Sequence, residues 1–299
     1  MATVLFAGFG DLGREAGRLL VESGLHVVAL RRSADADAVP GTAQHAVDLR
    51  APFTLPPLPE LPAAAVIAVS PERPEPDAYE AVYGGAVRHT LRALQAAGAK
   101  PKLVLFVSST GVWSESADLW MTEDVPAQPD SWRGEAMLRA EQALFAGPFP
   151  ATALRLAGIY GPGRYRLVRK AAAILAGGEA MPAPAYTNRI HRDDAARLIA
   201  FLVNRALAGA ALEKIYNGVD NEPSLNTDTL LWIMERLRGE RADVDFSAPI
   251  RGAVAVGGKR IGNARVRALG FQFRYPDFRA GYAAVVADWQ AAQDRERTA

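Results

Sequence analysis

Short apolar runs alternate with longer segments of helical periodicity through the first half of the chain. The apolar runs predict strands at residues 3–7, 26–30, 44–47, 64–69, 102–107 and 152–156. The periodic segments predict helices that begin at residue 14 and extend over about 77–97 and 131–145. Strands and helices that alternate in this way are typical of a parallel sheet with helices on both faces. We therefore expect an α/β fold with a doubly wound parallel sheet.

The pattern changes after Gly163. A basic amphipathic segment is followed by a Pro-rich loop and by further predicted elements: a helix that ends near residue 207, a strand at 215–217, and helices at about 226–237, 262–269 and 276–293. We interpret residues 1–163, to which 188–220 return, as the sheet domain. Residues 164–187 and 221–299 then form a small C-terminal lobe.

A G-x-G-x-x-G motif lies between the first strand and the first helix, at Gly8, Gly10 and Gly13. In such a turn the first glycine makes the bend, the second lets a pyrophosphate approach the backbone, and the third lets the helix pack on the strand. Amides at the helix start, including those of Asp11 and Leu12, then face the phosphates. The next predicted strand completes a βαβ unit, so we predict a Rossmann domain that binds NAD or NADP at these residues. The alternative is that the glycines only pack a turn.

The residues after the second strand bear on which dinucleotide binds. NAD-binding members of this fold usually carry an acid there for the ribose 2′-hydroxyl, whereas this chain has Arg31, Arg32 and Ser33. Two guanidinium groups and a hydroxyl suit a 2′-phosphate, so we expect NADP to be preferred over NAD. Asp35 and Asp37 lie close by in the sequence, so NAD remains an alternative cofactor. The arginines could also be a solvated strand end.

Other residues at predicted strand ends are candidates for ligand contacts, because ligands in such sheets lie beyond the carboxyl ends of the strands. They are Asp48, Ser70, Pro71, Ser108 and Thr110. Hydroxyl groups in this position also hydrogen-bond the local turn. The two roles, ligand contact and turn formation, both stay open for Thr110.

Composition narrows the class of protein. The chain has 299 residues, a formal net charge of +1 and no cysteine. The near balance of charge gives no support for a nucleic-acid partner, and the lack of cysteine excludes disulfides, thiolate metal sites and a cysteine nucleophile. No apolar run reaches the roughly 18 residues of a membrane-spanning helix, and no basic leader precedes the first strand. We expect a cytoplasmic protein that is not bound to a membrane and has no metal site.

The motifs stand in the order found in the extended short-chain dehydrogenase/reductases, the NAD(P)-dependent epimerase/dehydratase family, which the chain resembles over nearly its whole length. Beside the glycine turn, the resemblance rests on residues 108–113, 154–163 and 190–196. It implies that the C-terminal lobe binds substrate, that Asp48 contacts the adenine, and that Ser70 and Pro71 lie near the nicotinamide. Many relatives dimerise through a four-helix bundle, so a homodimer is one expectation and a monomer the other.

The family's chemistry uses a Ser or Thr, a Tyr and a Lys, the last two spaced Tyr-x-x-x-Lys. Thr110 matches the first position. Counting back from Glu141 puts Arg133 at the tyrosine position and Met137 at the lysine position, and the sequence has no Tyr-x-x-x-Lys anywhere. Met137 offers no cation, and Arg133 stays protonated, which makes it a poor proton carrier. Arg133 could instead hold an anionic substrate group or be a solvated helix residue.

Another group must move the proton if catalysis persists. Tyr160 and His191 lie in segments that the resemblance places beside the substrate, as do Tyr165 and Tyr186. The imidazole of His191 titrates near neutrality unless its surroundings perturb it. Packing is the alternative role for each of these side chains.

Two arginines in the second half are candidates for binding an anionic substrate. Arg164 begins a basic cluster in the region that meets a nucleotide-sugar diphosphate in the family, and Arg189 lies two residues before His191. A solvated helix face is the alternative for the cluster that begins at Arg164. Asn263 precedes a predicted late helix and is interpreted as its cap.

Two functions follow from these observations. The first is an atypical NAD(P)-dependent oxidoreductase or epimerase-like enzyme that acts on a small or nucleotide-linked carbonyl or sugar substrate; the retained substrate lobe favours it. The second is a non-catalytic NADP(H)-binding protein with a regulatory or redox-sensing role, which the missing Tyr and Lys favour. Turnover of cofactor with a panel of carbonyl compounds and sugar nucleotides would separate them.

Overall fold

The computed structural model describes residues 1–33, 39–114, 116–239 and 256–298. The chain divides into two compact units, each built from separate stretches of sequence. The first unit contains Met1–Ser114, Pro126–Leu156 and Ala195–Gly218, and the second contains Glu115–Val125, Ala157–Asp194 and Val219–Ala299. The division differs from the predicted boundaries chiefly at residues 115–125, 157–163 and 188–194, which were expected in the sheet domain and belong to the second unit.

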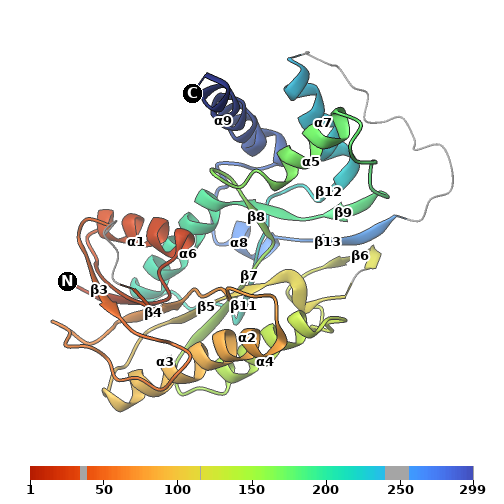
Figure 1. Cartoon of the computed structure of the whole chain (residues 1–299). Coiled ribbons are helices and arrows are strands. Elements are labelled where there is room, and N and C mark those ends of the chain that lie inside the picture. Colours follow the sequence, from red (N-terminus) through yellow and green to blue (C-terminus); the bar gives the residue numbers. More distant parts are fainter. Residues whose placement is uncertain (34–38, 115, 240–255, 299) are drawn as a thin grey trace. The chain divides into compact units, whose positions relative to one another are not determined.

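A parallel sheet forms the centre of the first unit (Figure 1). In the described residues its strands are β1 (Thr3–Ala7), β2 (His26–Arg31), β3 (Thr42–Ala46), β4 (Ala64–Ile67), β5 (Val104–Ser109), β7 (Ala151–Leu156) and β11 (Ile215–Gly218). Their order is β11-β7-β5-β4-β1-β2-β3, and every pairing is parallel. This confirms the predicted α/β class. The order reverses between β1 and β4, and ligands of such sheets bind beside a reversal of this kind.

Helices cover both faces of this sheet, as a doubly wound fold requires. Figure 1 shows α1 (Asp11–Glu22) and α6 (Arg192–Leu207) over one face and α3 (Gly85–Ala96) and α4 (Trp132–Phe145) over the other. All residues of β1 and β4 are buried, because central parallel strands are covered on both sides. The predicted third strand at 44–47 is β3, which begins two residues earlier and is only partly buried at the sheet edge.

The segment before α3 departs from the continuous helix predicted over 77–97. It consists of α2 (Pro76–Tyr79), a π-helical turn η1 (Glu80–Gly84) and then α3. Such turns are rare and occur often at functional sites. The Glu80 carboxylate holds this turn in place, because it pairs with Arg88 on α3 at 3.1 Å and with Arg139 on α4 at 3.3 Å.

In the described part of the chain, the second unit contains two small sheets of short strands. The strands are β6 (Ser116–Met121), β8 (Gly158–Tyr160), β9 (Ala185–Thr187), β10 (Arg189–His191), β12 (Ser224–Leu225) and β13 (Gly257–Ile261). Four of them form a sheet in the order β12-β9-β13-β6, and β8 pairs in parallel with β10. The sequence pattern predicted none of these strands, because they are short and their partners lie far away along the chain.

Helices supply most of the apolar core of the second unit. They are α5 (Arg166–Leu175), α7 (Asn226–Arg238), α8 (Ala264–Ala268) and α9 (Phe278–Thr298), close to the predicted ranges. Val168, Ile233, Phe278 and Val285 are buried together where α5, α7 and α9 meet. Among the helices of the described residues, none has the length and apolar character needed to cross a membrane.

Candidate functional site

The glycine turn after β1 is built as the motif predicts. Gly8 has a φ of +93°, and a Cβ atom there would lie 2.3 Å from the carbonyl oxygen of Ala68, so only glycine fits. A Cβ atom at Gly13 would lie 3.1 Å from the Gly8 carbonyl oxygen, which places α1 close against the turn. At Gly10, by contrast, a Cβ atom would meet no heavy atom within 4 Å. The turn is therefore closed on its protein side and open at Gly10.

The start of α1 completes this turn. The helix begins at Asp11, directly after Gly10, and no side chain caps it. Its first backbone N–H groups, including that of Leu12, have no partner within the helix by construction and attract anions. The open glycine and these amides fit a dinucleotide pyrophosphate, which needs close approach to backbone.

One of the basic residues at the end of β2 already forms an ion pair within the protein. Arg31 ends β2 and is partly buried, while Arg32 and Ser33 are exposed. Arg32 forms an ion pair with Glu72, and this guanidinium lowers the pKa of the Glu72 carboxyl. A guanidinium has five N–H donors, so Arg32 can keep Glu72 and still contact a 2′-phosphate. Asp35 and Asp37, which bear on NAD binding, lie outside the described residues.

Asp48 lies beyond β3 and forms a fixed pair with Arg50. Its carboxylate accepts hydrogen bonds from Arg50 Nε at 2.9 Å, from Nη2 at 2.7 Å and from the backbone N–H at 3.0 Å. These bonds lower the pKa of Asp48 to about 2. The carboxylate stays ionised and oriented, and its free lone pairs can accept an amine such as that of adenine.

The hydroxyl of Ser108 forms a hydrogen bond inside the first unit. It donates to Glu141 Oε1, and the same carboxylate accepts from Arg155 Nε at 3.0 Å and Nη2 at 2.7 Å. The Arg155 guanidinium also lies 4.5 Å from the ring centre of Trp113. All four side chains are buried. The hydroxyl of Ser108 therefore donates to an internal ion pair, and its contact with the cofactor stays a prediction.

The two positions at which the resemblance expects a tyrosine and a lysine both lie on α4. Ser131 caps this helix by accepting from the Gly134 N–H at 3.2 Å. Arg133 is exposed, with its guanidinium 4.8 Å from the ring centre of Trp132, and Met137 is 5% exposed among apolar neighbours. Neither residue can act as the family's pair does.

Thr110 lies beside the start of α4. It opens a short 3-10 turn, η2 (Thr110–Val112), at the end of β5. A Cβ atom at Gly134 would lie 2.2 Å from the Gly111 carbonyl oxygen, so helix and turn are in direct contact. Thr110 is 8% exposed. Its position at the carboxyl end of β5 fits the predicted role, with little of its surface accessible.

A group of aromatic side chains lies at the same end of the sheet. Tyr83 on η1 hydrogen-bonds the hydroxyl of Ser70, which follows β4 and is exposed. The Tyr83 ring packs edge-on against Phe106 of β5 and Tyr79, with centroids 6.3 and 5.4 Å apart, and Tyr79 contacts Trp132 of α4 at 4.8 Å. Burial raises the pKa of Tyr83 to about 12. Pro71 is partly buried next to Ser70.

Sequence reasoning passed over Tyr83. The residue lies inside what looked like an ordinary helix, 13 positions after Ser70, and no sequence pattern indicated that its phenol hydrogen-bonds Ser70. The one available signal was a pair of tyrosines, Tyr79 and Tyr83, in the segment that follows a predicted ligand-binding strand end.

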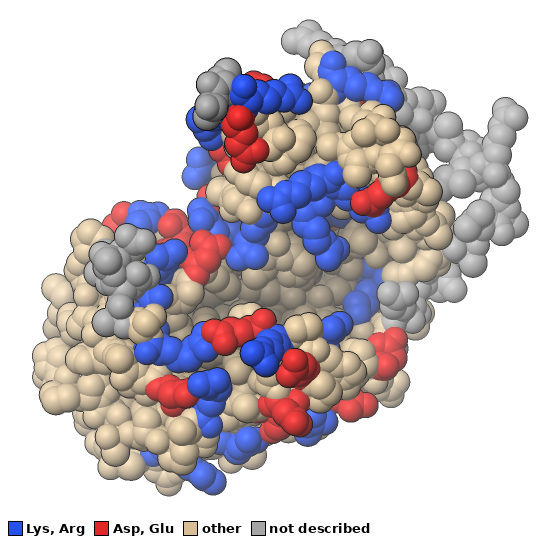
Figure 2. Space-filling view, viewed as in Figure 1, with Lys and Arg blue, Asp and Glu red and all other residues tan. Residues whose placement is uncertain are grey.

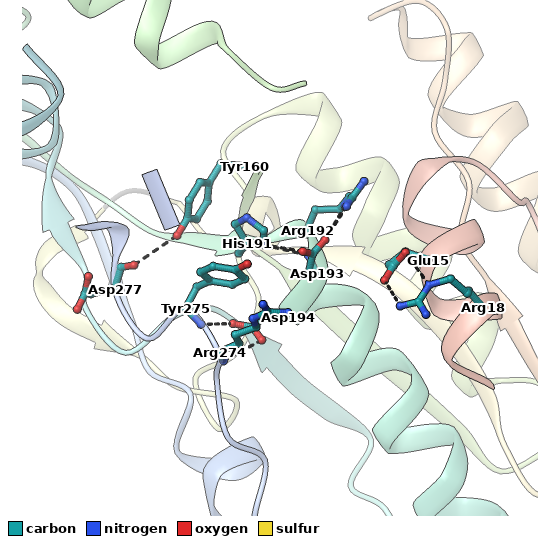
Figure 3. Close-up of polar contacts among 10 residues, drawn as sticks. All are labelled: Glu15, Arg18, Tyr160, His191, Arg192, Asp193, Asp194, Arg274, Tyr275 and Asp277. Atoms are coloured by element: carbon teal, nitrogen blue, oxygen red, sulfur yellow. Dashed lines mark hydrogen bonds and ion pairs between the residues drawn. The ribbon is translucent and has the colours of Figure 1, made fainter. Parts of the chain in front are cut away.

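His191 lies in the interior of the second unit (Figure 3). Its ring centre is 3.7 Å from that of Tyr275 and 5.3 Å from that of Tyr160. The ring nitrogen Nδ1 accepts the backbone N–H of Asp193 at 3.2 Å. Burial, the largest influence, lowers the pKa of His191. A neutral, 2%-exposed imidazole fits packing better than the predicted proton transfer.

Tyr160 is enclosed in the same way. Its phenol donates to the backbone carbonyl of Asp277 at 3.4 Å, as Figure 3 shows, and its ring stacks on Tyr282 at 4.5 Å. A Cβ atom at Gly281 would lie 2.0 Å from the phenol oxygen. Burial raises the pKa of Tyr160 far above its usual range. Within the second unit this geometry favours packing over the predicted catalytic role.

The two predicted substrate arginines have different surroundings. Arg189 is 6% exposed and donates to the hydroxyls of Ser224 and Thr187, so it is an internal residue of the second unit. Arg164 is exposed just before α5, and Arg166 and Arg169 are exposed on α5 itself. Figure 2 shows Lys and Arg atoms gathered over the region where Figure 1 places α5. Arg164 is therefore accessible to an anion and Arg189 is not.

Asn263 does not cap α8 with its side chain. Its amide instead donates to the carbonyls of Val219 and Asp220, each at 3.1 Å, and to Asn221 Oδ1 at 2.8 Å. Asn263 stands at the N-cap position as predicted, but its side chain holds a loop more than 40 residues earlier in the chain instead of capping the helix.

Comparison with known proteins assigns the family. No family model and no curated protein matches the sequence. MoeE5, solved with UDP-glucose and NAD, is 19% identical, with 98% of this chain and 100% of its own covered and a TM-score of 0.74. The human epimerase family protein SDR39U1, solved with NADPH, is 19% identical, with coverages of 96% and 100% and a TM-score of 0.70.

A third structure is closer in sequence. It is a protein of Methylobacillus flagellatus assigned to the NAD-dependent epimerase/dehydratases, 36% identical, with 97% of this chain and 99% of that chain covered and a TM-score of 0.77. Identity at this level along both units, together with the glycine turn after β1, shows that the chain belongs to the NAD-dependent epimerase/dehydratase family.

Proposed function

We propose that the chain binds a nicotinamide dinucleotide, with NADP preferred over NAD, and is an oxidoreductase or epimerase-like enzyme for a small or nucleotide-linked carbonyl or sugar substrate. The turn at Gly8 and Gly10 carries this proposal. It is closed toward the protein and open at Gly10, which is the arrangement that close approach of a pyrophosphate needs.

Different residues around the turn would contact different parts of the dinucleotide. The amides of Asp11 and Leu12 face the pyrophosphate, Arg31 and Arg32 hold a 2′-phosphate, and the ionised Asp48 accepts from adenine. When bound, the nicotinamide supplies or accepts a hydride. The nicotinamide half of the cofactor would then lie beside residues at the strand ends, which are Ser70, Pro71 and Thr110.

A nucleotide-linked sugar is the favoured substrate class. MoeE5, which shares the fold, was solved with UDP-glucose. The exposed Arg164, Arg166 and Arg169 of the second unit offer guanidinium groups to a diphosphate. Arg133 on α4 is exposed in the first unit and remains a separate candidate for an anionic substrate group.

A second candidate function is NADP(H) binding without catalysis, in a regulatory or redox-sensing role. The observation that favours it is α4, where Arg133 and the buried Met137 stand in place of the tyrosine and lysine. A protein that binds NADPH tightly and turns over no carbonyl or sugar-nucleotide substrate would fit this function.

Calorimetric titration with NADPH and NADH tests cofactor binding, after bound cofactor has been removed. We expect NADPH to bind more tightly, and Arg31→Ala to weaken NADPH by about tenfold, the effect of losing one charge-assisted contact of about 1.5 kcal/mol. NADH binding should change little. Arg92→Ala, at an exposed position on α3, is the matched control. If neither dinucleotide binds, the proposed function is wrong.

A further inference from the structure

We propose that Tyr83 is the proton carrier of this chain, in place of the tyrosine that the family has on α4. The proposal rests on the proposed function, since it assigns a residue to the same site. It depends on the position of η1, on the contacts of the Tyr83 phenol, and on the lack of a better candidate among the described residues.

The Tyr83 phenol lies at the ligand-binding end of the sheet. It reaches Ser70, which follows β4, and its ring contacts Phe106, which lies on β5. β4 is the strand beside the reversal of strand order, where ligands of such sheets bind. The turn η1 also packs on α4, the helix from which the family's tyrosine would come.

The π-helical turn positions this side chain. A π-turn adds a residue to the helical repeat and so changes the direction in which its side chains point. Glu80, at the start of η1, is paired with Arg88 and Arg139 on two different helices. Tyr79 and Phe106 flank the Tyr83 ring. The phenol is therefore held by its surroundings, as a group that must meet a substrate oxygen requires.

The chemistry suits a proton donor. With a pKa raised to about 12 by burial, the phenol is protonated at neutral pH, yet it is still more acidic than an alcohol. As a carbonyl carbon accepts the hydride that a bound reduced nicotinamide would supply, the Tyr83 Oη–H bond breaks, and an O–H bond forms on the substrate oxygen. The phenolate then regains a proton from water through the exposed hydroxyl of Ser70, whose donation lowers the Tyr83 pKa and so stabilises the phenolate.

The other candidates are less suited to the role. Tyr160 donates to a backbone carbonyl inside the second unit, and the 2%-exposed ring of His191 accepts from a backbone N–H. Arg133 on α4 is exposed but holds its proton too strongly to exchange it. Tyr83 combines an ionisable hydroxyl, a place at the strand ends and a hydroxyl partner that reaches solvent.

The first test asks whether Tyr83 lies next to the nicotinamide, and it needs no substrate. The full chain is labelled with ¹³C at tyrosine Cζ, and Tyr83→Phe and Tyr216→Phe identify two of the signals. Replacing bound NADPH by NADP⁺ adds a positive charge to the nicotinamide. We expect the Tyr83 signal to shift more than that of Tyr216, which is buried at the amino end of β11 and accepts from the Glu213 N–H.

The outcomes of this test are distinct. If calorimetry shows that both cofactors bind and the Tyr83 signal does not respond to the change of redox state, Tyr83 is not at the reacting centre and this inference is overturned while the proposed function stands. If neither cofactor binds, the proposed function fails and the inference fails with it. A shift confined to Tyr83 and its neighbour Tyr79 supports both.

The second test measures turnover with NADPH and the uncharged dicarbonyl phenanthrenequinone. Tyr83→Phe should lower kcat by about 10²- to 10⁴-fold, the usual contribution of general acid catalysis, and leave the Kd for NADPH unchanged. Tyr79→Phe, in the same aromatic group, should keep kcat within about threefold of the unmodified protein, since its hydroxyl has no assigned role. Equal kcat values for Tyr83→Phe and Tyr79→Phe would overturn the assignment.

Discussion

The first unit buries the carboxyl group of Glu141 and the second unit that of Asp220, and the two groups are stabilised in different ways. In the first unit, Glu141 accepts two hydrogen bonds from Arg155 and one from Ser108. In the second unit, Asp220 Oδ1 accepts the Glu222 N–H, and Oδ2 has no hydrogen-bond partner in the described part of the chain. Burial raises the pKa of Asp220 to about 8. Glu141 is thus stabilised by ionic pairing and Asp220 by protonation, two different ways to bury an acid.

The tyrosines differ between the units in a related way. Removal from solvent raises the pKa of both tyrosines, although Tyr83 is only partly buried and Tyr160 is buried. The hydroxyl of Tyr83 meets an exposed serine, whereas that of Tyr160 meets a backbone carbonyl that cannot pass on a proton. A perturbed pKa is therefore not sufficient to identify a functional tyrosine, and the partner of the hydroxyl separates the two cases.

The largest effect is expected from breaking the ion pair of the first unit. Glu141→Ala leaves the buried Arg155 guanidinium without its carboxylate and should lower the free energy of unfolding by about 3–5 kcal/mol. Urea denaturation measures the loss. Glu135→Ala, an exposed position on the same helix, should cost less than about 1 kcal/mol. Similar losses for the two variants would show that the pair does not hold the first unit.

Asp220→Asn tests protonation in the second unit. The folded-state pKa of about 8 lies above the usual value of 3.8. Between these values the unfolded chain loses the proton and the folded chain keeps it, so the free energy of unfolding falls as pH rises from about 4 to about 8, by at most about 1.4 kcal/mol per pH unit.

The amide of Asp220→Asn does not titrate, so this variant should lose that part of the pH dependence. Denaturant unfolding at several pH values within this window, compared with the unmodified protein, measures the difference. Asp124→Asn, at an exposed position, should keep the original slope. Parallel pH profiles for the unmodified protein and Asp220→Asn would mean that Asp220 is ionised in the folded state.

The smallest effect is expected from Tyr160→Phe. Loss of a long hydrogen bond to the Asp277 carbonyl should cost about 1 kcal/mol of unfolding free energy. Turnover of phenanthrenequinone should stay within about threefold of the unmodified protein. A 10²-fold fall in kcat with stability unchanged would reverse the roles of Tyr160 and Tyr83.

Local patterns were enough to predict the sheet of the first unit. Apolar runs such as those of β1 and β4 reflect burial on both faces, and the glycine spacing at Gly8 and Gly10 reflects a backbone conformation and an open approach that one stretch of sequence determines. The lack of a Tyr-x-x-x-Lys pair was likewise visible from the sequence alone.

The features that sequence analysis missed depend on distant partners. Ser108 is occupied by Glu141, 33 positions later, and Asn263 contacts residues more than 40 positions earlier. The phenol of Tyr83 hydrogen-bonds Ser70 from a π-turn that interrupts a segment whose composition reads as one helix. Periodicity describes neighbours along the chain and gives no information about such pairings.

The pairing of β6 with β13 has a consequence for the timing of folding during synthesis. Met121 on β6 lies opposite Ile261 on β13, about 140 residues later. At a synthesis rate of about 5–20 residues per second, β6 leaves the ribosome roughly 7–28 seconds before its partner exists. The first unit also needs residues up to Gly218 to add its last strand. The nascent chain therefore exposes the edge of β6 until Ile261 has been synthesised, and during this period a chaperone could protect that edge from wrong pairing.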